Sequence, residues 1–155
     1  MRYEDADDSL NQVFNRVIAE RFNSLQYLNF KLVYDTNKRM KVGQIVLAST
    51  EVASPKVKFF TMSAQAEDGY DCIMFIDKKG WGLASELDRV RIISHELRHV
   101  YLDEKGNPKI LNHEISDFYA EIALNADDQE WARKLSTLVF DIYEQEKDVI
   151  KGSVI

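Results

Sequence analysis

At 155 residues, the chain is long enough for a single domain with a real hydrophobic core. Its 45% hydrophobic and 30% charged residues are typical of a globular protein. A net charge of -6 without any run of Lys or Arg argues against a surface for nucleic acid or anionic membranes, because both need clustered cations. No apolar run reaches membrane-spanning length, and the acidic N-terminus lacks the apolar stretch of a secretory signal. We therefore expect a cytoplasmic protein with no membrane or nucleic-acid partner.

The N-terminal part of the chain predicts one amphipathic helix. Residues 1–7 are acidic and are expected to form a solvated, frayed lead. Asp8 or Ser9 can cap a helix, and apolar residues then recur at helical spacing until about Asn23. Because one face of this helix is apolar, we expect it to pack on a sheet.

The middle of the chain predicts strands. Apolar and polar residues alternate over 30–35, and a second strand is predicted over 42–51. Residues 57–61 suit either a short strand or an extended loop. The most strand-like run is Asp71–Ile76, and it contains Cys72, which has no disulfide partner and is expected to be a buried apolar residue.

The remainder predicts three helices. The first runs from a cap at Ser85 to about Glu104, the second starts near Asn112, and the third is capped by Asp127 or Asp128. Residues 148–155 are expected to be frayed. Together the elements predict one α+β domain over 1–155, with a small sheet of three to four strands packed by helices.

The histidines give the chain its most informative pattern. All three lie between residues 91 and 121, and two of them belong to the motif H-E-L-R-H, formed by His95, Glu96 and His99. Residues four apart lie on one face of a helix, so both imidazoles can converge on one metal ion. A chance occurrence on a solvated helix face is the alternative reading of the motif.

This motif predicts a catalytic zinc site. Catalytic Zn²⁺ takes three protein ligands and keeps an open position for water. His95 and His99 are the first two predicted ligands. Glu96 is placed to accept the proton of the zinc-bound water, whose pKa the metal lowers to about 7. We therefore predict Glu96 as the general base.

The third ligand is expected from the following helix, which folds back after the turn at Gly106–Pro108. His113, Asp117 and Glu121 recur every four residues and so form one polar stripe. His113 is the preferred third ligand, with Asp117 orienting a ligating histidine through a hydrogen bond. Glu114 and Glu121 are the alternative third ligands.

These motifs resemble those of known metallopeptidases. H-E-L-R-H is the zincin signature, and N-H-E-I-S-D is similar to the N-E-A-I-S-D of thermolysin-like peptidases, with His113 at the position of their ligating glutamate and Asp117 at that of their supporting aspartate. Over residues 30–120, the chain resembles the phage metallopeptidases and, more distantly, the SprT-like minimal zincins. The resemblance implies a compact zincin-like fold in which Asp71–Ile76 forms the edge of the substrate cleft.

The predicted function is hydrolysis of a peptide bond in a peptide or protein substrate, with Zn²⁺ as cofactor. Two alternatives stay open from the residues alone. A non-catalytic, zinc-stabilised module that binds a protein would use a fourth protein ligand, such as Glu114 or Glu121, in place of water. A zinc hydrolase of a non-peptide amide would use the same metal chemistry as a peptidase.

Overall fold

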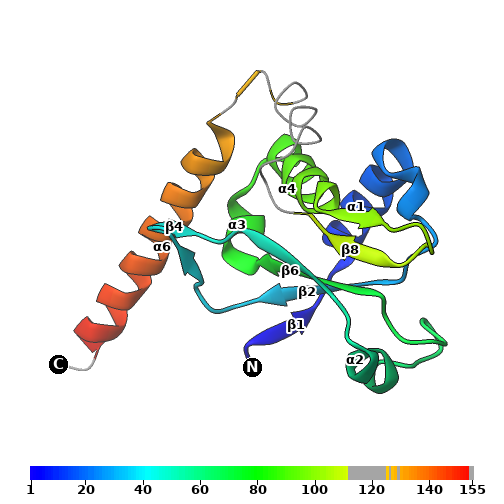
Figure 1. Ribbon diagram of the computed structural model, residues 1–155. Coiled ribbons are helices and arrows are strands. Elements are labelled where there is room, and N and C mark those ends of the chain that lie inside the picture. Colours follow the sequence, from blue (N-terminus) through cyan, green and yellow to red (C-terminus); the bar gives the residue numbers. More distant parts are fainter. Residues whose placement is uncertain (112–124, 126, 129, 154–155) are drawn as a thin grey trace.

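A mixed four-stranded sheet forms the centre of the computed structural model, which describes residues 1–111, 125, 127–128 and 130–153 (Figure 1). The strand order is β1-β2-β6-β5. β2 and β6 are parallel, and the two outer strands pair antiparallel to their neighbours. The bounds are Tyr3–Asp5 for β1, Phe30–Asp35 for β2, Ala48–Val52 for β5 and Cys72–Asp77 for β6. The alternation of apolar residues in β2 and the continuous apolar run in the central strand β6 explain why both sequences predicted strands.

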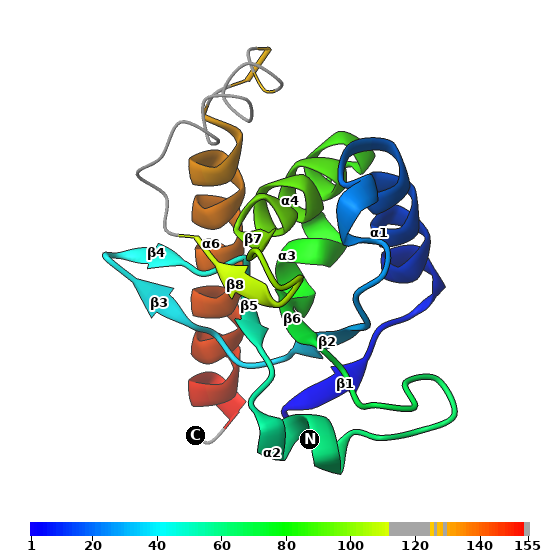
Figure 2. The same cartoon turned by 45° about the vertical axis from the view of Figure 1, so that its right-hand side comes forward.

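Helices cover one face of this sheet. α1 (Asp8–Arg21) and α4 (Glu86–Arg98) lie side by side in both views (Figures 1 and 2). They pack against the sheet face that carries Leu32, Met74 and Thr50, which are neighbours across β2, β6 and β5. The long C-terminal helix α6 (Trp131–Ser153) stands at the side of the sheet, beside the helix that follows β6. The α+β architecture predicted from the sequence is confirmed.

The first residues form an edge strand, so the prediction of a frayed lead was wrong. β1 pairs antiparallel with β2, although all three of its residues are exposed. Arg2 adds a salt bridge at 3.0 Å to the buried Asp35 at the end of β2. An exposed strand carries no apolar alternation, which is why its sequence gave no strand signal.

The predicted strand over 42–51 is interrupted by a hairpin. β3 (Met40–Lys41) pairs antiparallel with β4 (Gln44–Ile45), and only then does β5 begin. Val42 and Gly43 form the turn, with φ of 50° and 75°. Two successive residues with positive φ suit a two-residue hairpin turn, and Val is an unusual choice for it.

Two short helices lie on either side of β6 in the sequence, and the first overlaps residues 57–61, which were predicted as a strand or loop. α2 (Pro55–Phe60) is capped by Ser54, whose Oγ accepts a hydrogen bond from Val57 N at 3.2 Å. Pro55 occupies the start of the helix, where its lack of an N–H costs nothing. α3 (Lys78–Leu83) is capped by Asp77 in the same way. Ser54-Pro55 and Asp77 are sequence signals of a helix start. The apolar pattern of the residues around them favoured strands and concealed these signals.

The histidine-bearing helix is shorter than predicted. It begins after Ser85, as expected, but ends at Arg98 and not near Glu104. β7 (Val100–Leu102) and β8 (Pro108–Ile110) form a hairpin there, turned by Gly106 at φ 81°. The pairing of these two strands outweighs the helical spacing on which the longer prediction rested.

The C-terminal helix and the cysteine mostly follow the predictions. Trp131, Leu135 and Val139 of α6 are buried, whereas Leu138 is 46% exposed. The helix continues to Ser153 through most of the segment predicted to be frayed. Cys72 is buried in β6, where burial raises the pKa of its thiol to about 12. Within the part of the chain that the structure describes, no helix is both long and apolar enough to cross a bilayer.

Candidate metal centre

α4 presents the motif because its other side is fixed in the core. Ser85 caps the helix by accepting a hydrogen bond from Asp88 N at 3.1 Å. Ile93 and Leu97 are fully buried and anchor the helix against the sheet and α1. Because His95 lies two residues from each of them along the helix, its imidazole is turned to a different side, where it is half-buried.

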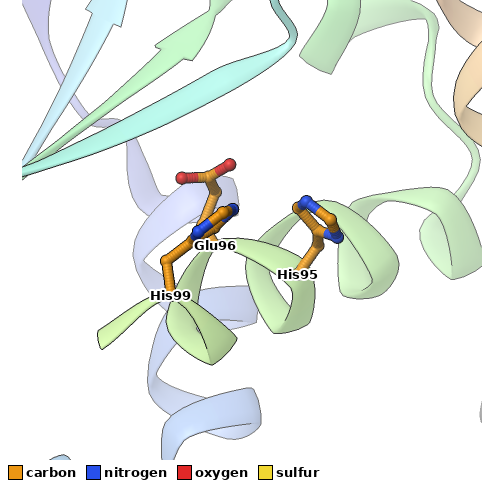
Figure 3. A group of neighbouring side chains, drawn as sticks. All are labelled: His95, Glu96 and His99. Atoms are coloured by element: carbon orange, nitrogen blue, oxygen red, sulfur yellow. The ribbon is translucent and has the colours of Figure 1, made fainter. Parts of the chain in front are cut away.

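The motif residues converge in space. The candidate ligand atoms of His95, Glu96 and His99 all lie within 4.8 Å of one another. The two imidazole rings are 5.1 Å apart and nearly perpendicular, at 78°. In Figure 3 all three side chains rise from the helix toward the sheet. This donor set fits a zinc ion, because imidazole nitrogens and carboxylate oxygens are among its common ligands.

His99 is held in place by Leu111, the residue that follows β8. It is the C-cap of α4, and its backbone dihedrals of -70° and -20° are still helical, so its side chain stays in phase with that of His95. Its Nδ1 lies 2.7 Å from the carbonyl oxygen of Leu111, which can only accept, so Nδ1 carries the hydrogen. Leu111 N also donates to the His99 carbonyl oxygen at 2.6 Å. A metal ligand held in this way binds through Nε2, with a fixed ring orientation.

Glu96 is the buried member of the group. It is 6% exposed, and its Oε2 accepts a hydrogen bond of 2.9 Å from the Thr50 hydroxyl of β5. Burial raises the pKa of the Glu96 carboxyl, while the charge of His99, the Thr50 hydrogen bond and the charge of Arg39 oppose the rise. Thr50 was not singled out from the sequence, because nothing near position 50 relates it to a residue 46 positions later.

The strand that borders the group is β5 and not β6. The predicted cleft edge, Asp71–Ile76, contains the central strand β6, which is paired on both sides with β2 and β5. β5 is the edge of the sheet and carries Thr50, so the earlier assignment was wrong. The most hydrophobic strand is central because it is buried on both flanks, whereas an edge strand has weaker apolar alternation.

Four predicted residues lie outside the described residues. They are His113, the preferred third ligand, its alternatives Glu114 and Glu121, and Asp117, the predicted orienting residue. Asn125 is the first described residue after this gap, and the carboxylate of Asp127 pairs with the buried Arg91 of α4. The roles of these four residues stay predictions.

A cavity of about 600 Å³ opens beside the three motif residues. α4 contributes Ile92 and the motif itself, and β5 contributes the stretch that contains Thr50. The β3–β4 hairpin and the first turns of α6 supply the facing walls. This volume lies in the range of small-molecule and peptide side-chain sites in proteins.

The sequence that carries this motif matches a known protein family. Residues 1–141 match the family described as "Putative phage metallopeptidase". The chain belongs to this family. Its membership confirms the resemblance predicted from H-E-L-R-H and the surrounding elements. The curated proteins contain no match to the chain.

Membership in this family makes a metal-dependent peptidase the activity indicated for the chain. A metallopeptidase needs a metal ion, and His95, Glu96 and His99 are the group that the described residues offer for it. A peptidase acts on a peptide or protein substrate, in agreement with the predicted partner.

Proposed function

We propose that the chain hydrolyses peptide bonds with a zinc ion held by His95, His99 and His113. The observation that carries the proposal is Glu96, a buried carboxylate within 4.8 Å of two histidine ligand atoms and fixed by Thr50. A bound Zn²⁺ would supply a Lewis acid for the scissile carbonyl and would acidify water at neutral pH.

Glu96 is the general base and proton carrier of the reaction. Its carboxylate accepts a proton from the attacking water and then gives it to the departing amine. Glu96 is 6% exposed, so its burial shields this proton exchange from bulk water. Thr50 keeps one carboxylate oxygen bonded, so the other oxygen has a defined direction.

His99 and Leu111 support the proposed ligand set. The hydrogen bond from His99 Nδ1 fixes the ring tautomer, and the adjoining hairpin fixes where Leu111 lies. We propose His113 as the third metal ligand, with Glu114 or Glu121 as the alternative third ligands. Asp117 is proposed to orient a ligating histidine.

The substrate backbone is proposed to pair with β5, an edge strand of the four-stranded sheet that lies beside β8. An extended peptide can add to an exposed sheet edge through main-chain hydrogen bonds. Among the described strands, β5 is the edge that borders the motif residues. A peptide there runs past Glu96, whose carboxylate reaches β5 through Thr50.

The decisive experiment combines metal binding and turnover. Glu96→Gln should retain about one zinc per chain, because its two histidine neighbours are unchanged, and should lose at least about 100-fold in turnover of a peptide library. His113→Ala should weaken zinc affinity by on the order of 10- to 100-fold or more, whereas Glu114→Ala and Glu121→Ala should not.

The pattern of outcomes separates the alternatives. Hydrolysis by Glu96→Gln at the wild-type rate would remove Glu96 from the chemistry. Zinc bound at one per chain without any turnover of peptides or amides would favour the protein-binding module. If small amides are hydrolysed and peptides are not, the site is that of a non-peptide amidase.

A further inference from the structure

Beyond the motif residues, the cavity has a largely apolar lining. Its walls include Ile45 of β4, Ile92 of α4, Ile110 of β8 and Trp131 of α6. Outside the metal centre, Lys41 is the one charged side chain among the described residues of the lining. An acidic group of a ligand would find only Lys41 as an oppositely charged partner there, whereas an apolar group would lose no hydration on entering.

The hydroxyl groups of the lining are already engaged by the protein. Ser49 Oγ accepts a hydrogen bond of 2.7 Å from Arg39, and Thr50 donates to Glu96. Ser136 Oγ accepts from Ile45 N at 2.9 Å and lies 3.4 Å from Ile45 O. Because these polar atoms bond within the protein, the surface they leave to a ligand is chiefly hydrocarbon.

The two facing walls of the cavity are tied together. Ser136 is 4% exposed, and its hydrogen bonds to the backbone of Ile45 fasten β4 to α6. Trp131 of α6 and Ile92 of α4 are also buried. The cavity is therefore formed before any ligand enters, which lowers the entropic cost of binding.

Val42 stands at the rim with an unfavourable backbone conformation. It is 94% exposed and has a φ of 50° at the tip of the β3–β4 hairpin. A β-branched residue is an outlier in this region, which Asn or Gly occupies at lower cost. An exposed, strained apolar residue beside a cavity suggests a contact made with a ligand.

We infer that the β3–β4 hairpin and α6 form an apolar subsite that takes a large apolar side chain of the substrate, next to the bond that is cut. The side chain enters between Ile45 and Trp131, and Val42 closes over it from the rim. This inference rests on the proposed peptidase function and names the residue class that the peptidase selects.

The subsite is tested first with zinc-loaded wild-type protein and a peptide panel that varies one position beside the cleaved bond. Peptides with Phe or Leu should be cleaved with a kcat/KM on the order of 10- to 100-fold above those with Ala or Asp, because more apolar surface is buried. Equal cleavage of all four peptides would overturn the subsite while leaving the peptidase function in place.

Filling the cavity should remove this selectivity. Ala132 is exposed on α6 and lines the cavity, so Ala132→Phe places a ring inside it without disturbing the core. The ratio of kcat/KM for the Phe peptide to that for the Ala peptide should fall by about tenfold. Thr137→Phe adds the same ring to an exposed position of α6 away from the lining, and should leave the ratio unchanged.

A second variant separates binding from folding. Val42→Asn relieves the unfavourable φ, so its midpoint of urea unfolding should rise, while kcat/KM for the Phe peptide should fall by roughly fivefold. A variant that is more stable and equally active on the Phe peptide would exclude Val42 from the subsite.

Binding to zinc-loaded Glu96→Gln protein distinguishes failure of the subsite from failure of the peptidase function. Fluorescence anisotropy should show tighter binding of the Phe peptide than of the Ala peptide, with the difference lost in Glu96→Gln/Ala132→Phe. If this pattern appears although wild-type protein cleaves no peptide, the subsite stands and the peptidase proposal fails. If neither peptide binds nor is cleaved, both fail.

Discussion

The hydroxyl of Thr50 connects the substrate-binding side of the sheet to the proposed general base. Glu96 is 6% exposed, so an oxygen that loses its hydrogen bond there would not recover one from bulk water. Thr50 belongs to the edge strand, so a peptide paired with β5 would touch the same strand that orients the carboxylate. Under the proposed function, Thr50 is therefore a positioning residue for Glu96.

Replacing Thr50 tests this role. Thr50→Val keeps the shape and removes the donor, and we expect kcat to fall on the order of tenfold because a hydrogen bond to a charged group contributes about 1.5–3 kcal/mol. KM and zinc content should change less. Thr50→Ser restores the hydroxyl and should recover most of kcat. Equal losses in both variants would indicate a packing effect of the methyl group instead.

The β7–β8 hairpin is the element that fixes His99. Asp103 organises its turn, since its Oδ1 accepts hydrogen bonds from Lys105 N and Asn107 N, both at 2.9 Å. Gly106 has a φ of 81°, and the strand that follows carries the chain to Leu111, whose carbonyl holds the imidazole. Distortion of the turn should therefore reach the metal centre through Leu111.

Gly106→Ala measures that connection. An alanine at this φ costs about 1 kcal/mol, so the free energy of unfolding should fall by that amount. Because Leu111 shifts with the strand, the dissociation constant for zinc should rise several-fold in a chelator competition assay. Gly82→Ala is the matched control, since Gly82 is in α3 with open space around it and without a positive φ. It should be neutral or slightly stabilising and leave zinc affinity unchanged.

Across the whole molecule, a buried carboxylate joins three segments of the chain. Asp35 at the end of β2 is 1% exposed and bonds to Arg2, before β1, and to Arg39, before β3, at 3.0 and 3.1 Å. Burial alone would raise the pKa of Asp35, but the hydrogen bonds from Arg2 and Asn37 and the charges of both arginines outweigh it. The pKa therefore lies below its ordinary value.

This lowered pKa predicts an acid-sensitive contribution to stability. Folding favours the ionised form of Asp35, so its contribution is complete above the unfolded-state pKa of about 3.9 and is lost as pH falls through the lower folded-state value. Asp35→Asn should cost roughly 1–2 kcal/mol near pH 7, less than a fully buried pair because Arg2 is 42% exposed. In urea unfolding, the difference in free energy of unfolding between wild type and Asp35→Asn should stay constant from pH 8 to 5 and decrease toward pH 3. If the destabilisation by Asp35→Asn is the same at every pH, it arises from packing and not from the charge of Asp35.

The sequence was informative where a segment carries its own signal. Alternation located β2, a continuous apolar run located β6, and the Ser85 cap located the start of α4. H-E-L-R-H predicted the convergence of His95 and His99, because residues four apart share one face of a helix. Such features depend on neighbours within a few residues.

The features that were missed depend on distant partners. β1 is a strand because β2 offers it a free edge, and its own exposed side chains give no sign of this. α4 ends at Arg98 because β8 returns to pair with β7, which helical spacing could not reveal. Thr50 and the assignment of β5 as the edge strand likewise follow from the order of the sheet.

The bond between Ser136 and Ile45 has a consequence for how the protein is made. The two residues are 91 positions apart, and the hairpin wall of the cavity is fastened to α6 through them. Synthesis proceeds from the N-terminus, so the motif residues emerge well before the helix that completes the wall. A nascent chain that has not yet reached α6 therefore carries the motif residues without one wall of the cavity, and under the proposed function it should cleave peptides poorly.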